Sequence, residues 1–146
     1  MYEKLFEPID VGPITIPNRI VRSAHSTALP LKRLIAYHEA RAVGGVGMST
    51  LEATGVHLSS PAMRSIIPLH DDSVIPFYKE LSDALRPHGM RILQQIYHPG
   101  SARAPGKGTF QISSSAIPNP IAGGIPTAMT IPMIEEMVEA FASAAR

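Results

Sequence analysis

The stretch that decides the fold is residues 19–56, RIVRSAHSTALPLKRLIAYHEARAVGGVGMSTLEATGV. Its first residues, 19–24, are typical of a short buried strand, and Leu31 to Val43 carries apolar residues at helical spacing. Gly44-Gly45 then predicts the end of that helix, and a second strand is expected at 46–52. The order strand, helix, strand predicts parallel pairing with a right-handed crossover.

The pattern continues on both sides of this stretch. A β-hairpin is predicted at 9–16 around Gly12-Pro13. Further along the chain, a helix capped by Asp72 and then a third strand at 90–97 are predicted. Thr130 is expected to cap a last helix. We expect the core-facing side chains of that helix to be Ile134, Met137, Val138, Phe141 and Ala145. The fold class is therefore α/β, with a hairpin at 1–18 and three βα units at 19–146.

Composition bounds the class of protein. The chain has 146 residues, of which 45% are hydrophobic and 17% charged, which fits one globular domain. Its net charge of +1 gives no basic footprint for nucleic acid or an anionic membrane. With no Cys, no run of about 20 apolar residues and no signal-peptide pattern, we expect a cytoplasmic protein without a cysteine metal site.

Two segments break the regular pattern. Residues 99–129 show no periodicity and are rich in Gly, Pro and Ser, which favours a binding loop, a lid or disorder. The last helical pattern reaches Ala145-Arg146 without a Gly, Asn or Pro to stop it. We interpret this as a truncated chain, in which the first and last strands of the sheet leave open edges that favour self-association into homo-oligomers.

Several motifs, in order, resemble the old yellow enzyme family of flavin oxidoreductases. They are LFEPIDVGPITIPNRIV (5–21), YHEARAVGGVGMSTLEATGV (37–56), ILQQIYHPG (92–100), SSSAIP (113–118) and the closing helix. The resemblance implies the N-terminal part of a (β/α)8 barrel that binds FMN, with NAD(P)H, often NADPH, as reductant. The first motif continues here as Ser23-Ala24-His25, and this form is most similar to the branch of the family with 2,4-dienoyl-CoA reductase and trimethylamine dehydrogenase. Only a longer parent chain of that branch would add an iron–sulfur (4Fe-4S) cluster and FAD.

The resemblance also implies which residues touch the flavin. Ser23, Ala24 and Ala53 would contact the ring through backbone atoms, His25 would line it, and Ser26 would lie near C4=O. The Gln95 amide would meet N3–H and C2=O, since it offers both an acceptor and a donor. Because Ser26 replaces the cysteine that some relatives join covalently to FMN, we expect non-covalent binding.

Other interpretations of these residues stay open. Ser23 and Ser26 could be turn residues, Gln95 could satisfy a neighbouring backbone group, and His25 could be a packed core histidine. Glu52 could be a base, although pairing with a barrel arginine is the preferred hypothesis. His98 is a weaker candidate for acid–base catalysis.

The third loop departs from the family, because Ser101 follows His98-Pro99-Gly100 where relatives carry arginine. The family's substrate-anchoring and phosphate-binding motifs have no counterpart before Arg146, so the catalytic residues are unknown. The sequence thus predicts an FMN oxidoreductase for a small-molecule substrate, an electron-poor alkene or an amine. The alternative is a non-catalytic barrel fragment that associates with itself or another chain, and we expect the 146 residues alone to be inactive.

Overall fold

The structure is a computed structural model that describes residues 2–60, 68–102 and 111–146. The chain divides into two compact units. Of the described residues, unit 1 contains 2–53 and 72–95, and unit 2 contains 54–60, 68–71, 96–102 and 111–146. No helix in the described ranges is long and apolar enough to cross a membrane.

Unit 1 begins with the predicted hairpin. After a 3-10 turn at Glu3–Leu5, strands β1 (Ile9–Val11) and β2 (Ile14–Ile16) pair antiparallel. Gly12 makes the turn with a φ of +56°, a region that glycine enters without steric cost. The Arg91 Nε donates to the carbonyl oxygen of Thr15 at 3.1 Å, so the hairpin contacts the start of the third strand.

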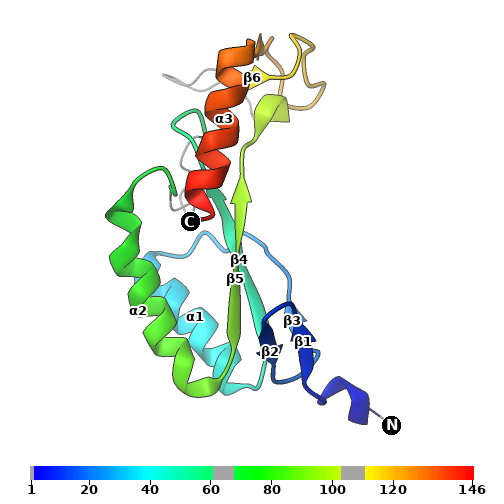
Figure 1. The fold of residues 1–146 in the computed structure, drawn as a ribbon, viewed down its shortest axis with the longest axis vertical. Coiled ribbons are helices and arrows are strands. Elements are labelled where there is room, and N and C mark those ends of the chain that lie inside the picture. Colours follow the sequence, from blue (N-terminus) through cyan, green and yellow to red (C-terminus); the bar gives the residue numbers. More distant parts are fainter. Residues whose placement is uncertain (1, 61–67, 103–110) are drawn as a thin grey trace. The chain divides into compact units, whose positions relative to one another are not determined.

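The central sheet has the order β3, β4, β5 (Figure 1). Strand β3 (Val21–Arg22) pairs in parallel with β4 (Met48–Gly55), and β5 is Arg91–Tyr97. The Arg91 N–H donates to the carbonyl oxygen of Gly47, and the Val56 N–H donates to the carbonyl oxygen of Tyr97. Residue numbers rise in the same direction along both strands, so β4 and β5 are parallel. All three predicted strands are confirmed, but β3 is shorter than the expected 19–24.

Two helices of unit 1 follow β3 and β4 along the chain. Helix α1 (Leu31–Val43) has the predicted bounds and ends at Gly44-Gly45, where Gly45 has a φ of +85°. Helix α2 is Ile75–Leu85, and its buried face includes Phe77, Leu81 and Leu85. The prediction of Asp72 as its cap was wrong. A 3-10 turn over Asp72–Val74 precedes the helix, and Val74 holds the cap position without a side-chain bond. Another 3-10 turn, Arg86–His88, ends this segment.

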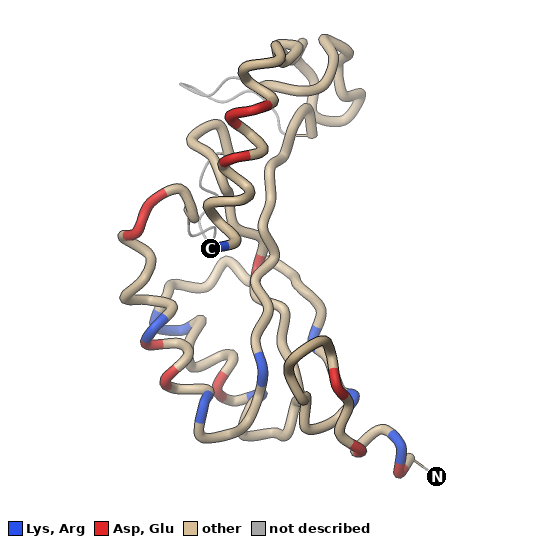
Figure 2. Tube along the Cα trace, viewed as in Figure 1, with Lys and Arg blue, Asp and Glu red and all other residues tan. Residues whose placement is uncertain are grey.

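Charged residues of both signs are interspersed along the described trace (Figure 2). On α2, Asp83 pairs with Lys79 one turn before it and with Arg86 three residues after it. Such exposed pairs contribute little stability.

Unit 2 packs helix α3 (Ile131–Ala144) on a small apolar core of Val56, Ile112 and Met137. The segment 99–129 contributes a 3-10 turn (Gly100–Ala102) and two short parallel strands, β6 (Ile112–Ser113) and β7 (Thr127–Ala128). Part of that predicted binding loop, residues 103–110, lies outside the described residues.

The predicted face of α3 was partly wrong. Met137 is buried and Phe141 packs against the core, but Ile134 and Val138 are 39% and 64% exposed. Besides Met137 and Phe141, the helical residues that pack on the core are Met133, Ala140 and Ala144, whereas Ala145 is exposed at the C-cap position. Thr130 occupies the cap position as predicted, without a side-chain hydrogen bond to the helix.

Candidate functional site

The residues predicted to contact flavin all lie in unit 1, at the carboxyl ends of the three parallel strands. The segment Ser23–Ser26 directly follows β3, Ala53 lies near the end of β4, and Gln95 lies near the end of β5. Ser23, His25, Ser26 and Gln95 are exposed, whereas Ala24 and Ala53 are half-buried. In parallel α/β folds this edge is where ligands bind, because the loops that follow the strands converge there.

Glu52 connects the three predicted segments. Its Oε1 accepts a hydrogen bond from the backbone N–H of Thr27 at 2.8 Å and another from the Thr27 hydroxyl. Its carbonyl oxygen accepts from Nε2 of Gln94 at 2.6 Å. Thr27 follows Ser26, Gln94 precedes Gln95, and Glu52 itself precedes Ala53. The predicted contacts therefore flank one hydrogen-bonded centre.

The preferred sequence hypothesis for Glu52, pairing with a barrel arginine, stays a prediction, because Arg64 and Arg103 lie outside the described residues. In the described part of the chain no arginine pairs with Glu52, and the carboxylate instead binds Thr27. Its side chain is 4% exposed, and Oε2 is buried with no hydrogen-bond partner among the described residues. The sequence interpretation missed Thr27 and Gln94, although a carboxylate inside a strand of small and apolar residues was a signal of a buried polar centre.

His25 is oriented by a neighbouring arginine. Nη2 of Arg22 lies 2.9 Å from Nδ1 of His25, and Nη1 donates to the carbonyl oxygen of Thr50 at 2.8 Å. Guanidinium only donates, so Nδ1 is the acceptor in the closer contact, and the same Nη2 lies 3.4 Å from Nε2 of the ring. The ring also meets Tyr37 edge-on, with centroids 6.3 Å apart. The Tyr37 ring lies under the guanidinium of Arg41 at 3.2 Å, a cation–π contact that further fixes the cluster.

Unit 2 holds a second polar cluster, joined through the Ser59 hydroxyl. Its oxygen lies 2.7 Å from Nδ1 of His57 and 2.9 Å from Nε2 of His98. Backbone N–H groups of Ser59 and Gly100 donate to Nδ1 of His57 and of His98, which places the ring protons on both Nε2 atoms. His57 Nε2 then donates to Glu136 Oε1 at 3.1 Å. Burial, with the nearby His57 second, lowers the pKa of His98, so His98 stays neutral at neutral pH.

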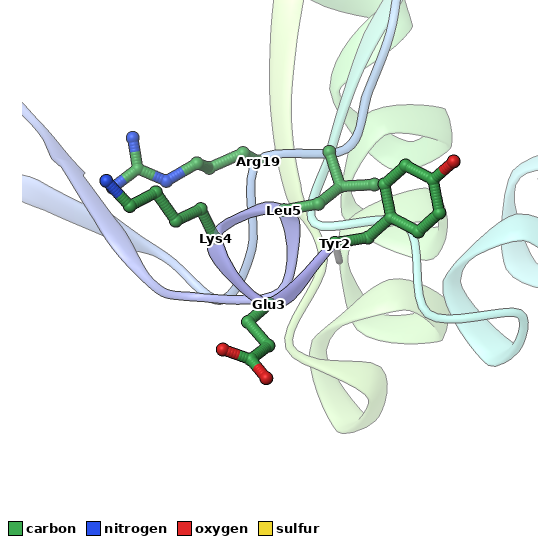
Figure 3. A pocket seen from close by; sticks show the side chains of 5 residues that line it. All are labelled: Tyr2, Glu3, Lys4, Leu5 and Arg19. Carbon is green, nitrogen blue, oxygen red and sulfur yellow. The ribbon is translucent and has the colours of Figure 1, made fainter.

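The described residues also line three cavities away from the candidate site. One of about 510 Å³ is lined by Tyr2, Glu3, Lys4, Leu5 and Arg19 (Figure 3). Arg19 precedes β3 whereas Ser23 follows it, so this cavity lies at the opposite end of the strand from the candidate site. A second, about 250 Å³ in unit 1, is lined by residues that include Ile14, Leu85 and Arg91. A third, about 240 Å³ in unit 2, is lined by residues that include His57, His70 and Glu136.

Comparison with known proteins identifies similar sequences and one family pattern. Residues 4–146 match the sequence pattern of the NADH:flavin oxidoreductase / NADH oxidase family. An NADH oxidase of Thermoanaerobacter brockii is 34% identical over 99% of this chain and 24% of its own length. An N,N-dimethylglycine/sarcosine dehydrogenase of Chromohalobacter salexigens is 35% identical over 68% of this chain and 15% of its own.

A solved structure shows the same fold. A 2-naphthoyl-CoA reductase in complex with 2-naphthoyl-CoA superposes with a TM-score of 0.85 and 28% identity, over 99% of this chain and 25% of that one. The chain thus has the fold of the first three βα units of a (β/α)8 barrel, and it spans about a quarter or less of these three relatives.

Proposed function

The chain belongs to the NADH:flavin oxidoreductase / NADH oxidase family, and on that premise we propose that residues 23–26, Ala53 and Gln95 hold the isoalloxazine ring of FMN. The observation that carries the proposal is the centre at Glu52, whose bonds to Thr27 and Gln94 link the three segments. A flat polar ring needs donors and acceptors arriving from several chain segments, and that is what converging strand ends supply.

The donor set fits the ring. The segment Ser23–Ser26 offers backbone groups in an exposed loop, and the exposed Gln95 amide offers a carbonyl and an NH2 group for N3–H and C2=O. His25, held by Arg22, would line the ring, and the Ser26 hydroxyl would donate near C4=O. Ser26 has no thiol to form a covalent link, so binding is non-covalent.

FMN supplies the hydride chemistry when it is bound, and the protein supplies binding, orientation and electrostatics. We propose that the enzyme would reduce an electron-poor alkene with a hydride from NAD(P)H, or would oxidise an amine to an imine and give the two electrons to a separate electron acceptor, with bound FMN supplying the hydride chemistry in either case. The 2-naphthoyl-CoA reductase and the N,N-dimethylglycine/sarcosine dehydrogenase among its relatives support these two classes. No described residue is assigned to proton transfer in this reaction.

Gln95→Leu tests the site through flavin affinity. The substitution leaves polar ring atoms unpaired, so FMN binding to the chain should weaken by roughly 1–3 kcal/mol in a titration followed by flavin fluorescence. Gln111→Leu, in unit 2, is the matched control and should leave the titration unchanged. Equal affinity of wild type and Gln95→Leu would contradict the role of Gln95.

Ser26→Ala tests the hydroxyl separately. A donor near C4=O stabilises the negative charge of reduced flavin, so its loss should weaken the binding of reduced FMN more than that of oxidised FMN. The two affinities, measured by titration with and without dithionite, give the change in potential through a thermodynamic cycle. An equal loss for both redox forms would assign Ser26 to ring binding alone and remove its proposed effect on potential.

A further inference from the structure

Stability alone does not account for a carboxylate at position 52. The side chain is 4% exposed, yet only one of its two oxygens has a hydrogen-bond partner among the described residues. A buried charge is costly unless it is fully paired, and apolar substitutes for buried ionic groups are often as stable. What the carboxylate does provide is one strong acceptor for two donors of the same residue, the N–H and the hydroxyl of Thr27.

The residue after Thr27 has an uncommon backbone conformation. Ala28 has a φ of +55°, and it is the one non-glycine residue of the described chain with a positive φ. Its Cβ makes this left-handed region unfavourable, so the surrounding structure must hold it there. Contacts lie on both sides. Glu52 holds Thr27, and the N–H of Leu29 donates to the Thr27 hydroxyl oxygen at 3.3 Å.

We propose that Glu52 is a positioning residue for the flavin site: by holding Thr27 it keeps Ala28 left-handed and fixes the course of residues 23–26 before the ring binds. A segment that is already ordered loses less conformational freedom on binding, and affinity rises accordingly. The same residue receives Gln94 on its carbonyl oxygen, so it aligns the Gln95 strand with that segment. This inference rests on the proposed flavin site.

Ala28→Gly in the full 146-residue chain separates positioning from stability. Glycine adopts a φ of +55° without strain but also reaches many other conformations, so the relief of strain and the added freedom of the unfolded chain largely cancel. The midpoint of thermal unfolding should therefore stay unchanged or rise. Backbone order parameters of residues 23–29 should fall, and FMN affinity should fall about 3- to 10-fold. Ala116→Gly, at an exposed position of unit 2, is the matched control and should change neither.

Glu52→Gln tests the other end of the same contact. The amide keeps an acceptor oxygen for Thr27 but loses the charge, so the 23–29 segment should again lose order and FMN affinity. Both changes act on the same contact. The Ala28→Gly/Glu52→Gln double variant should therefore have an FMN affinity no lower than that of whichever single variant binds FMN less tightly. Additive losses would mean that Glu52 acts independently of Ala28.

The outcomes separate this inference from the proposed function. If no variant, wild type included, binds FMN, the flavin site itself is wrong, and positioning for flavin is overturned with it. If wild type binds FMN and Ala28→Gly binds equally well with unchanged order at 23–29, the flavin site stands and the positioning role is overturned. If FMN affinity falls in each variant only in proportion to its loss of thermal stability, the positioning role is also overturned.

Discussion

Helix α1 carries a buried histidine that should make the stability of the chain depend on pH. His38 is 0% exposed, its Nδ1 lies 3.2 Å from the Ser49 hydroxyl, and its Nε2 has no hydrogen-bond partner among the described residues. Burial, together with the positive charges of Arg22 and Arg41, lowers the pKa of His38 from 6.5 to about 4. The folded chain therefore keeps this ring neutral in conditions where the unfolded chain protonates it.

The sign and size of the effect follow from that difference. Between pH 6.5 and 4 the unfolded state binds the extra proton, so the free energy of unfolding falls as the pH falls. At 1.36 kcal/mol per pKa unit, the full loss is about 3 kcal/mol, of which about 2 kcal/mol is lost by pH 5. Above pH 6.5 this contribution is fully present.

Urea denaturation followed by far-ultraviolet circular dichroism, at a series of pH values from 8 to 5, measures this loss. The variant His38→Leu/Ser49→Ala removes both polar partners together. Between pH 8 and 5 its free energy of unfolding should fall by about 2 kcal/mol less than that of wild type. His88→Gln, at an exposed position, is the control and should keep the wild-type pH dependence. The same pH dependence in wild type and the His38 variant would refute the reasoning.

Three further predictions concern packing, edges and activity. A Cβ at Gly47 would lie 2.6 Å from two oxygens of Asn18, so Gly47→Ala should lower the free energy of unfolding by about 1–3 kcal/mol in the same denaturation assay. Strands β3 and β5 each have one neighbour in the described sheet, so the chain should self-associate with rising concentration in sedimentation velocity, and a monomer throughout would contradict this. With FMN added, the 146 residues should not consume NADH or NADPH, and turnover measured at 340 nm would show that these residues suffice for catalysis.

Local signals in the sequence were sufficient for most elements of the fold. Helix α1 has its predicted bounds because apolar spacing and Gly44-Gly45 mark both its face and its end. The face of α3 could not be predicted as well, since apolar residues cover most of that helix outside the polar strip of Glu135, Glu136, Glu139 and Ser143. There the packing partner, the core at Ile112 and Val56, decides that Met133 is covered and Val138 is not.

The sequence predicted which strand ends the candidate site residues occupy, but it did not predict the hydrogen bonds between those segments. Strand ends placed Ser26, Ala53 and Gln95 at one edge of a parallel sheet, as the structure has them. The bond between Thr27 and Glu52 joins residues 25 positions apart, and no local pattern encodes such a contact. The same limit applies to His57 and His98, which lie 41 positions apart and are joined through the Ser59 hydroxyl.

The central claim is that flavin binds at the carboxyl ends of β3, β4 and β5, and chemical-shift mapping tests it most directly. FMN would be titrated to millimolar concentration into the isotope-labelled chain, since weak binding still shifts the resonances of contacting groups. We expect shifts in the backbone amides of Ser23, Ala24 and Ala53 and in the side-chain NH2 of Gln95. An absence of shifts there, or shifts confined to the Arg19 cavity at the other end of the strand, would contradict the account.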